Sequence, residues 1–443
     1  MSNIKNIFKK SDDPNSVWNH MGQVLILTLA GSFIYFLPFF RFYFYDTFVE
    51  AFGISNTQMG LIGTVYGACG VVSYFIGGLL ASKFSVRKLM VFSFIATGIG
   101  GLVLMTYPPF PVVIAVQIGW GFTSLMTFWP ALVKALNMLG NENEKGKSFG
   151  FMEGGRGISN IIFMTIAVGI FDFFTKKMNA QAGLTSVMAF YSVLAFIMAI
   201  FIFFALKGIE EKSDGEEEKN NKLDVALLKQ VLKNKYMWMM VTIMFCSYTM
   251  CIAYTYFNPY ATSQFGSTVT FAAFITTFAQ YTRPVACIGS GTLADKISSS
   301  RVFLIGFLMM IAGLIGVLVI PGQASMIPVF IIAVAACYIA MYATQSLHFT
   351  LFEEARFTPD VVALAIGIAC TIGYLPEMII PMIAGRLLDK YPGIVGYRYF
   401  FFVMLAFMVI GISVLFIWMV LTKERRMELI QMGKRKKAKK ETA

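Results

Sequence analysis

The sequence predicts an all-α membrane protein with twelve transmembrane helices in two six-helix bundles. Three observations predict it: the composition, the apolar runs and an internal repeat. Hydrophobic residues make up 57% of the 443 residues and charged residues only 14%, whereas about 25% is ordinary for a soluble domain. A soluble fold could not hide so much apolar surface, because its exterior needs polar cover. A lipid-facing surface removes this limit, so the composition indicates the membrane class.

Twelve apolar runs follow one another along the chain. A spanning helix needs about 20 mostly apolar residues. The runs that meet this length cover residues 21–45, 58–82, 88–107, 110–135, 149–174, 184–206, 236–259, 269–294, 301–320, 324–350, 359–387 and 396–422. Residues 1–20 are polar and the first run is long, so we expect it to stay in the membrane and not to act as a cleavable signal.

One long connection, residues 207–235, divides these runs into two sets. Acidic residues crowd positions 210–218, and an amphipathic stretch follows at 223–232. We expect a solvated linker with a short helix at the membrane surface. The predicted organisation is an N-terminal segment (1–20), a first six-helix bundle (21–206), the linker (207–235), a second six-helix bundle (236–422) and a basic tail (423–443).

The distribution of positive charge predicts the orientation. The net charge is +12, and with both termini inside the cell the inside segments hold roughly 28 of the 36 Lys and Arg residues. We therefore expect a multi-pass protein of the cytoplasmic (inner) membrane with both termini cytoplasmic. The positive charge is expected to set the orientation in the membrane and to contact anionic lipid. No nucleic-acid partner is expected.

An internal repeat relates the two predicted halves. Gly78-Leu79-Leu80-Ala81-Ser82-Lys83 matches Gly291-Thr292-Leu293-Ala294-Asp295-Lys296 at a spacing of 213 residues. Phe52-Gly53 and Phe265-Gly266 match at the same spacing. Two matches at one spacing indicate a duplicated six-helix unit.

The repeated loop resembles the signature of the major facilitator superfamily between its second and third helices, G-x-L-a-D-r-x-G-r-k. The second copy keeps the acid as Asp295, whereas the first copy has Ser82 in its place. The resemblance covers residues 20–422 and implies a secondary transporter. It also implies a cytoplasmic gate in which the acid lies near a helix N-terminus, where a carboxylate is stabilised and a serine can cap. The gating residues that it implies are Gly78, Ser82, Arg87, Gly291, Asp295 and Arg301.

Three segments resemble one part of this superfamily, the organophosphate antiporters and the related sugar-phosphate and sugar-acid permeases. They are residues 56–60, 128–130 and 150–157. In organophosphate carriers one arginine in helix 1 and another in helix 7 clamp phosphate. Arg41 lies near the outer end of the first span, but Tyr254 stands 213 residues later, so the second arginine is not reproduced. Many proton-coupled exporters have an arginine in helix 4 where this chain has Ala115.

Arginines inside the predicted spans are the candidates for solute binding, because a charge there costs about 2.5–3.5 kcal/mol on insertion scales. A guanidinium fork suits two oxygens of a phosphate, sulfonate or carboxylate. Arg283 lies in the middle of the eighth span and could bind solute or, alternatively, neutralise Glu377. Arg41 could bind solute or, alternatively, extend its side chain to the outer headgroups. The candidate substrate-binding residues are Arg41, Arg283, Tyr35, Tyr254 and Gln280.

Acidic residues within the spans are candidates for coupling or for charge pairs. Glu377 lies in the eleventh span between Pro376 and Pro381, which are expected to break the helix. It could carry a coupling proton or form a structural salt bridge. Glu153 and Arg156 are three residues apart and so share one helix face, which predicts an intrahelical or gating ion pair; contact with the substrate is the alternative.

The function predicted from these features is secondary active transport of a small, anionic organic solute by alternating access. Exchange and symport with a proton or sodium ion both stay open, and a monomer is expected. No metal-ligand cluster, nucleophile motif or phosphate loop is present in the sequence, so we expect neither an enzyme nor a cofactor. The alternatives are an exporter of amphipathic drugs and a membrane sensor that kept the carrier fold.

Overall fold

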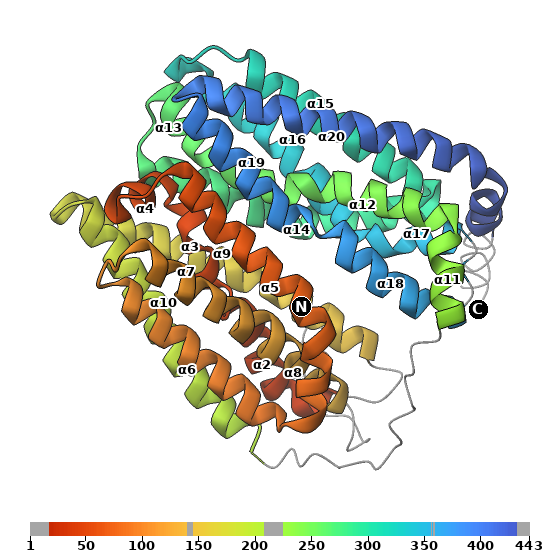
Figure 1. Cartoon of the computed structure of the whole chain (residues 1–443), viewed down its shortest axis with the longest axis horizontal. Helices are drawn as coiled ribbons and strands as arrows, with labels where there is room; N and C mark the ends of the chain where they lie inside the picture. Colours follow the sequence, from red (N-terminus) through yellow and green to blue (C-terminus); the bar gives the residue numbers. More distant parts are fainter. Residues whose placement is uncertain (1–16, 140–144, 208–224, 356, 358, 432–443) are drawn as a thin grey trace, which may run out of the picture. The chain divides into compact units, whose positions relative to one another are not determined.

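The computed structural model describes residues 17–139, 145–207, 225–355, 357 and 359–431. Within these ranges every regular element is a helix, which confirms the predicted all-α membrane fold (Figure 1). The acidic stretch of the predicted linker and the last basic residues of the tail lie outside the described residues. The amphipathic stretch forms α11 (Val225–Lys233), which packs against α12 and α18.

The described residues fall into two compact units. The first lies within residues 1–54 and 65–215, and the second within residues 55–64 and 216–443. The first unit contains η1 (Val17–His20), α2 (Met21–Phe33), α3 (Phe36–Tyr43), α4 (Tyr45–Phe52), most of α5 (Asn56–Lys83), α6 (Val86–Leu104), α7 (Phe110–Gly121), η2 (Phe122–Phe128), α8 (Trp129–Met138), α9 (Lys145–Lys177) and α10 (Ala180–Ala205). The start of α5, up to Thr64, belongs to the second unit.

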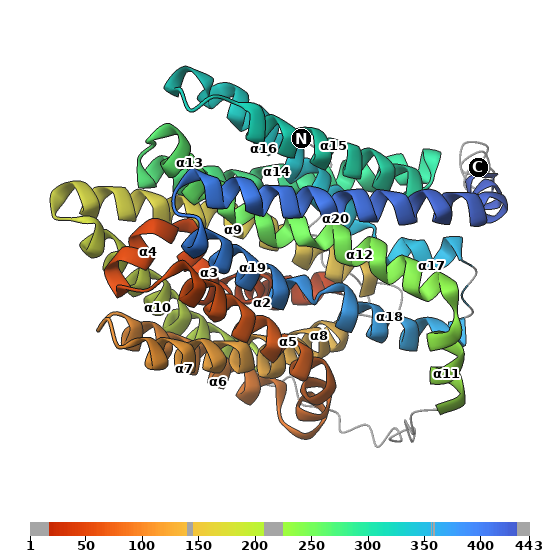
Figure 2. The same ribbon diagram turned by 45° about the horizontal axis from the view of Figure 1, so that its top comes forward.

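The second unit continues from α11 through the remaining helices (Figure 2). These are α12 (Lys235–Ala253), η4 (Tyr254–Tyr256), α13 (Phe257–Phe265), α14 (Val269–Ile297), α15 (Ser299–Val319), η5 (Ala324–Met326), α16 (Ile327–Ser346), η6 (His348–Thr350), α17 (Leu351–Glu354), α18 (Pro359–Gly373), α19 (Pro376–Lys390) and α20 (Ile394–Leu421). A further helix follows over residues 423–431.

Every predicted span coincides with one helix or with a broken run of helices. Among the described residues, nine helical stretches are long and apolar enough to cross a membrane, and the bent pair α2–α3 would make ten. The other two predicted spans are α5 and α14, which have 28 and 29 residues. At about 1.5 Å per residue both are long enough to cross a bilayer. Side chains such as Phe204, Val285 and Val420 are 64–75% exposed, as expected of a lipid-facing surface.

Prolines explain the breaks within the spans. The predicted first span is interrupted between α2 and α3, which meet at 47°, because the ring of Pro38 crowds the carbonyl of Ile34 four residues earlier. In the same way Pro259 follows the short 3₁₀ segment η4. Pro376 begins α19 after a break at residues 374–375, as predicted, whereas Pro381 lies inside an unbroken α19. The second predicted break is therefore wrong.

The internal repeat is visible in the backbone. Gly53 ends α4 with φ 59° and ψ 36°, and Gly266 ends α13 with φ 59° and ψ 28°. Both adopt the left-handed conformation that favours glycine at a helix C-terminus. The two Phe-Gly pairs that match at a spacing of 213 residues therefore each end a helix with a left-handed glycine.

A π-helical segment, η2, interrupts the fourth span of the first unit. Three of its hydroxyl side chains form hydrogen bonds with neighbouring helices: Thr127 with Ser93 at 2.6 Å, Thr123 with Thr97 at 2.8 Å, and Ser124 with Tyr66 at 2.8 Å. These bonds join η2 to α5 and α6. The widened turn is thus held by polar contacts within an otherwise apolar bundle.

Candidate functional site

A polar cluster lies inside the second unit, where α12, α14, α16 and α19 meet. Arg283 on α14 is half-buried, and its guanidinium carbon is 5.5 Å from the ring centre of Tyr342 on α16. Cys251 on α12 lies within electrostatic range of both Arg283 and Glu377. We call Arg283, Tyr342, Cys251 and Glu377 the Arg283 cluster. The arginine and the acid that the sequence singled out therefore lie in the same unit, each within electrostatic range of Cys251.

Glu377 is placed by the break before α19. It lies in the first turn of that helix and is half-buried, where the helix dipole favours a negative charge. The hydroxyl of Tyr248 donates to Glu377 Oε1 at 3.3 Å, and the rings of Tyr248 and Tyr374 are 4.5 Å apart. The carboxyl group is therefore held by helix geometry and by a tyrosine, while part of its surface stays accessible.

Two further predicted residues lie close to the Arg283 cluster. Tyr254 is half-buried in η4, stacks perpendicular to Tyr338 at 5.7 Å, and lies within electrostatic range of Tyr342. Gln280 lies one turn before Arg283 on α14 and is only 5% exposed. Tyr254 adds an accessible aromatic side chain to the cluster, whereas Gln280 is enclosed by protein.

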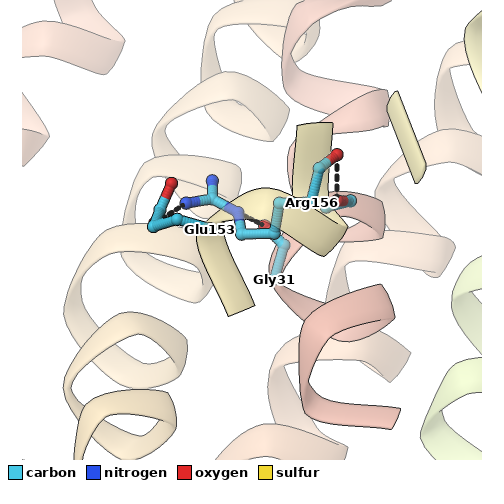
Figure 3. A network of polar contacts seen from close by, with 4 residues as sticks. Gly31, Glu153 and Arg156 are labelled. Carbon is cyan, nitrogen blue, oxygen red and sulfur yellow. Dashed lines mark hydrogen bonds and ion pairs between the residues drawn. The ribbon is translucent and has the colours of Figure 1, made fainter. Parts of the chain in front are cut away.

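A second polar site lies in the first unit, around Arg156 on α9 (Figure 3). Its Nη1 forms an ion pair with Glu153 Oε1 at 2.6 Å, which confirms the predicted pair. Its Nε donates to the carbonyl of Gly31 on α2 at 2.9 Å. The guanidinium carbon lies 5.6 Å from the ring of Tyr35 and 5.2 Å from that of Trp129. We call these five residues the Arg156 site.

The broken first span explains why Gly31 can accept this bond. In a regular helix the carbonyl of Gly31 would accept from the amide of Tyr35, but that amide donates to Ser32 instead, at 3.1 Å. Helices α2 and α9 also approach closely, since a methyl group at Gly155 would overlap the side chain of Thr28. Arg156 can therefore lie across α2 and donate to the Gly31 carbonyl, which has lost its usual amide donor at the bend.

Arg41 occupies a different environment from Arg283. It lies on α3, is 2% exposed, contacts the carbonyl of Pro38 through Nη1, and lies 4.3 Å from the ring centre of Phe42. Its side chain is enclosed by the first unit and does not extend to an exposed surface, so extension toward outer headgroups is excluded in this structure.

The predicted gating residues lie at helix ends. Gly78 and Ser82 fall near the end of α5, and the surroundings of both residues lie outside what the structure describes. Arg87 on α6 stacks over the ring of Phe203 at 3.9 Å. In the second copy Gly291 and Asp295 lie toward the end of α14, and Arg301 lies in the first turn of α15. The side chains of Asp295 and Arg301 are exposed.

A buried acid that the sequence did not single out, Glu354, caps the N-terminus of α15. Glu354 is 3% exposed, and its Oε1 accepts from the amide of Ser300 at 3.0 Å. Its Oε2 accepts from the indole of Trp418 on α20 at 2.9 Å. The adjacent acid Glu353 is exposed, so two neighbouring carboxylates lie in opposite environments, a difference that depends on the packing of α15 and α20.

The described residues contain no group of three or more His, Cys, Asp or Glu side chains that could hold a metal ion. Both polar sites instead combine one arginine, one carboxylate and aromatic rings. This chemistry suits binding of an oxyanion or a hydrogen-bonding solute, and within the described sites it includes no nucleophile paired with a base.

Comparison with known proteins identifies the family. A model of the Major Facilitator Superfamily matches residues 22–373. Inner membrane protein YihN of Escherichia coli strain K12 is 30% identical over 414 residues, which cover 91% of this chain and 96% of that protein. Inner membrane protein YqcE of the same organism is 25% identical over 404 residues, 90% and 94% of the two chains.

Solved structures show the same fold. A bacterial homolog of the human lysosomal transporter Spinster, inward-facing and unoccupied, matches with a TM-score of 0.73 at 13% identity, covering 95% of this chain and 99% of that one. The nucleoside transporter NupG matches with a TM-score of 0.69 at 14% identity, covering 91% and 99%. With its apolar helices and inner-membrane relatives, the protein is a multi-pass inner-membrane protein. The chain belongs to the Major Facilitator Superfamily and is a membrane transporter, not an enzyme.

Proposed function

We propose that this transporter moves a small anionic organic solute across the cytoplasmic membrane by alternating access, with Arg283 as the residue that binds the anion. One observation carries the proposal: an accessible arginine, Arg283, lies 5.5 Å from the ring centre of Tyr342 inside a bundle of apolar helices, and an accessible carboxylate, Glu377, lies in the same unit. Charged residues at such a depth are costly and mark solute or ion pathways.

The chemistry of the cluster favours an oxyanion. A guanidinium presents two parallel N–H donors that match two oxygens of a phosphate, carboxylate or sulfonate. Tyr342 and Tyr254 supply aromatic surface beside it. The burial of Arg41 supports giving Arg283 the main role, because a solute reaches an accessible side chain without displacing packed protein.

Glu377 supplies a route to coupling. When the solute binds at Arg283, Glu377 can accept a proton or help hold a sodium ion, because it is an acid inside the same apolar bundle. Exchange without a coupling ion needs only that a second solute replaces the first at Arg283. Measuring flux with and without a proton or sodium gradient distinguishes these modes.

The first test is a ligand screen of the purified protein by thermal shift. The panel contains sugar phosphates, sugar acids, sulfonates and dicarboxylates, with amphipathic cations as the contrasting class. A ligand present at 100 times its dissociation constant stabilises the folded protein by about 2.7 kcal/mol. Stabilisation by one class of anion supports the proposal, and stabilisation by cations alone would refute it.

The second test uses a matched pair of arginine variants in proteoliposomes. Arg283→Lys keeps the positive charge but loses the planar fork, so it should weaken binding of the identified anion about tenfold or more. Arg386→Lys changes an exposed arginine on α19 in the same way and should behave like the parent. Equal affinity and equal uptake for both variants would remove Arg283 from the binding site.

A further inference from the structure

The Arg156 site has unused hydrogen-bonding capacity. Arg156 uses Nε for Gly31 and Nη1 for Glu153. Within the described ranges Nη2 has no hydrogen-bond partner, and it is not among the fully enclosed polar atoms. The side chain of Arg156 is 13% exposed and that of Glu153 is 42% exposed. One edge of the guanidinium is therefore open to a ligand.

One of the aromatic neighbours of Arg156 adds a hydrogen-bond donor. Tyr35 and Trp129 lie near the guanidinium within the range of cation–π attraction. The indole N–H of Trp129, which is only a donor, has no partner among the described residues, and Trp129 is half-buried. Arg156 and Trp129 thus offer two donors in one place, a combination suited to an oxyanion.

The site is also held in place before any ligand arrives. The carbonyl of Gly31 fixes Nε, and the absence of a side chain at Gly31 leaves room for Arg156, whose Cδ would lie 3.1 Å from an added methyl group. A guanidinium fixed by backbone on a rigid helix loses little freedom on binding. Glu153, by contrast, is the more exposed partner of the pair.

We propose that Arg156 is a second oxyanion-binding residue of the transporter, and that a carboxylate, phosphate or sulfonate group of the solute displaces Glu153 from it. This inference rests on the proposed function, since it assigns a further binding residue for the same anionic solute. Glu153 is then a competitor that occupies Arg156 while the site is empty.

A competitor and a purely structural partner have opposite consequences when they are removed. If Glu153 competes with the solute, Glu153→Gln removes the charge that must be displaced and should increase anion affinity about tenfold or more. If the pair only stabilises the helix, the same change should lower thermal stability and leave affinity unchanged.

The experiment measures equilibrium binding of glucose 6-phosphate, gluconate and inorganic phosphate to the full-length protein in detergent. We expect tighter binding for Glu153→Gln, at least tenfold weaker binding for Arg156→Lys, and several-fold weaker binding for Trp129→Phe, which keeps the ring but loses the N–H. Lys176→Gln is the matched control, because it breaks an exposed ion pair with Asp172, 2.7 Å long, on the same helix, and it should bind like the parent.

The outcomes separate this inference from the proposed function. If Glu153→Gln gains no affinity and Arg156→Lys and Trp129→Phe lose none, while Arg283→Lys still weakens binding, only the role of Arg156 is refuted. If none of these probes and no anion of the thermal-shift panel binds the parent or any variant, the proposed function fails together with this inference. Gel filtration checks that each variant is folded, and if Arg156→Lys is not, Glu153→Gln and Trp129→Phe decide the question.

Discussion

The enclosed carboxylate of Glu354 provides the most direct test of the structure. Glu354→Gln keeps the shape of the side chain but offers only one acceptor oxygen to two donors, the amide of Ser300 and the indole of Trp418, at 3.0 and 2.9 Å. One buried donor then faces an amide nitrogen, which costs about 1–3 kcal/mol. The loss of a negative charge at the N-terminus of α15 adds about 0.3–2 kcal/mol.

Arg426 adds to this cost. It lies in the helix over residues 423–431 and is 6% exposed; burial lowers its pKa, and the nearby charge of Glu354 opposes that effect. The combined destabilisation is about 3 kcal/mol, which corresponds to a decrease in Tm of about 6–12 °C for a unit of roughly 200 residues.

The assay is thermal unfolding of the purified protein in detergent. The matched control is Glu353→Gln, because the adjacent side chain is exposed, and among the described residues the bond it takes part in is accepted by its backbone carbonyl, from Arg425. Equal melting temperatures for Glu354→Gln and Glu353→Gln would show that the carboxylate of Glu354 does not stabilise the N-terminus of α15.

Three further predictions concern gating, topology and packing. Asp295→Asn should slow transport and spare equilibrium affinity if this exposed acid serves a gate; unchanged turnover would exclude that role. Cysteines replacing Lys176 and Lys390 should react with membrane-impermeant reagents from outside the cell, and labelling only from the cytoplasm would overturn the proposed orientation. Gly60→Ala places a methyl group against a backbone oxygen of α19 and should lower the free energy of unfolding by about 1–3 kcal/mol. Gly119→Ala, which has no neighbouring atom within 4 Å of the added methyl group, should be neutral. Equal effects of the two variants would contradict the close approach of Gly60 to α19.

The helices were predictable because hydrophobic length and proline chemistry are local properties. The position of Pro38 is sufficient to explain the bend between α2 and α3, although sequence analysis placed a single span there. The left-handed glycines at Gly53 and Gly266 also follow from the repeated Phe-Gly pair. Helix breaks and helix ends could be predicted because they depend on residues no more than about four positions away in the sequence.

The sites were less predictable because they depend on contacts between distant helices. Spacing alone indicated the pair of Glu153 and Arg156, but not the carbonyl of Gly31, which lies 125 residues away in the sequence. Nor could it distinguish enclosed Arg41 from accessible Arg283, since both are arginines in apolar runs. Burial of this kind is decided by which helix faces pack together, and one sequence does not contain that information.

The π-helical segment η2 has a consequence for comparing this chain with its relatives. A π-helical turn closes its bond one residue later than an α-helical turn, so it behaves as a single-residue insertion in an otherwise regular helix. Homologues with a regular fourth span should align with a one-residue gap within residues 122–128, and not in the loops on either side. Deleting one residue there should leave residues 129–138 in their present register, whereas the same deletion in α6 would rotate everything beyond it by about 100°.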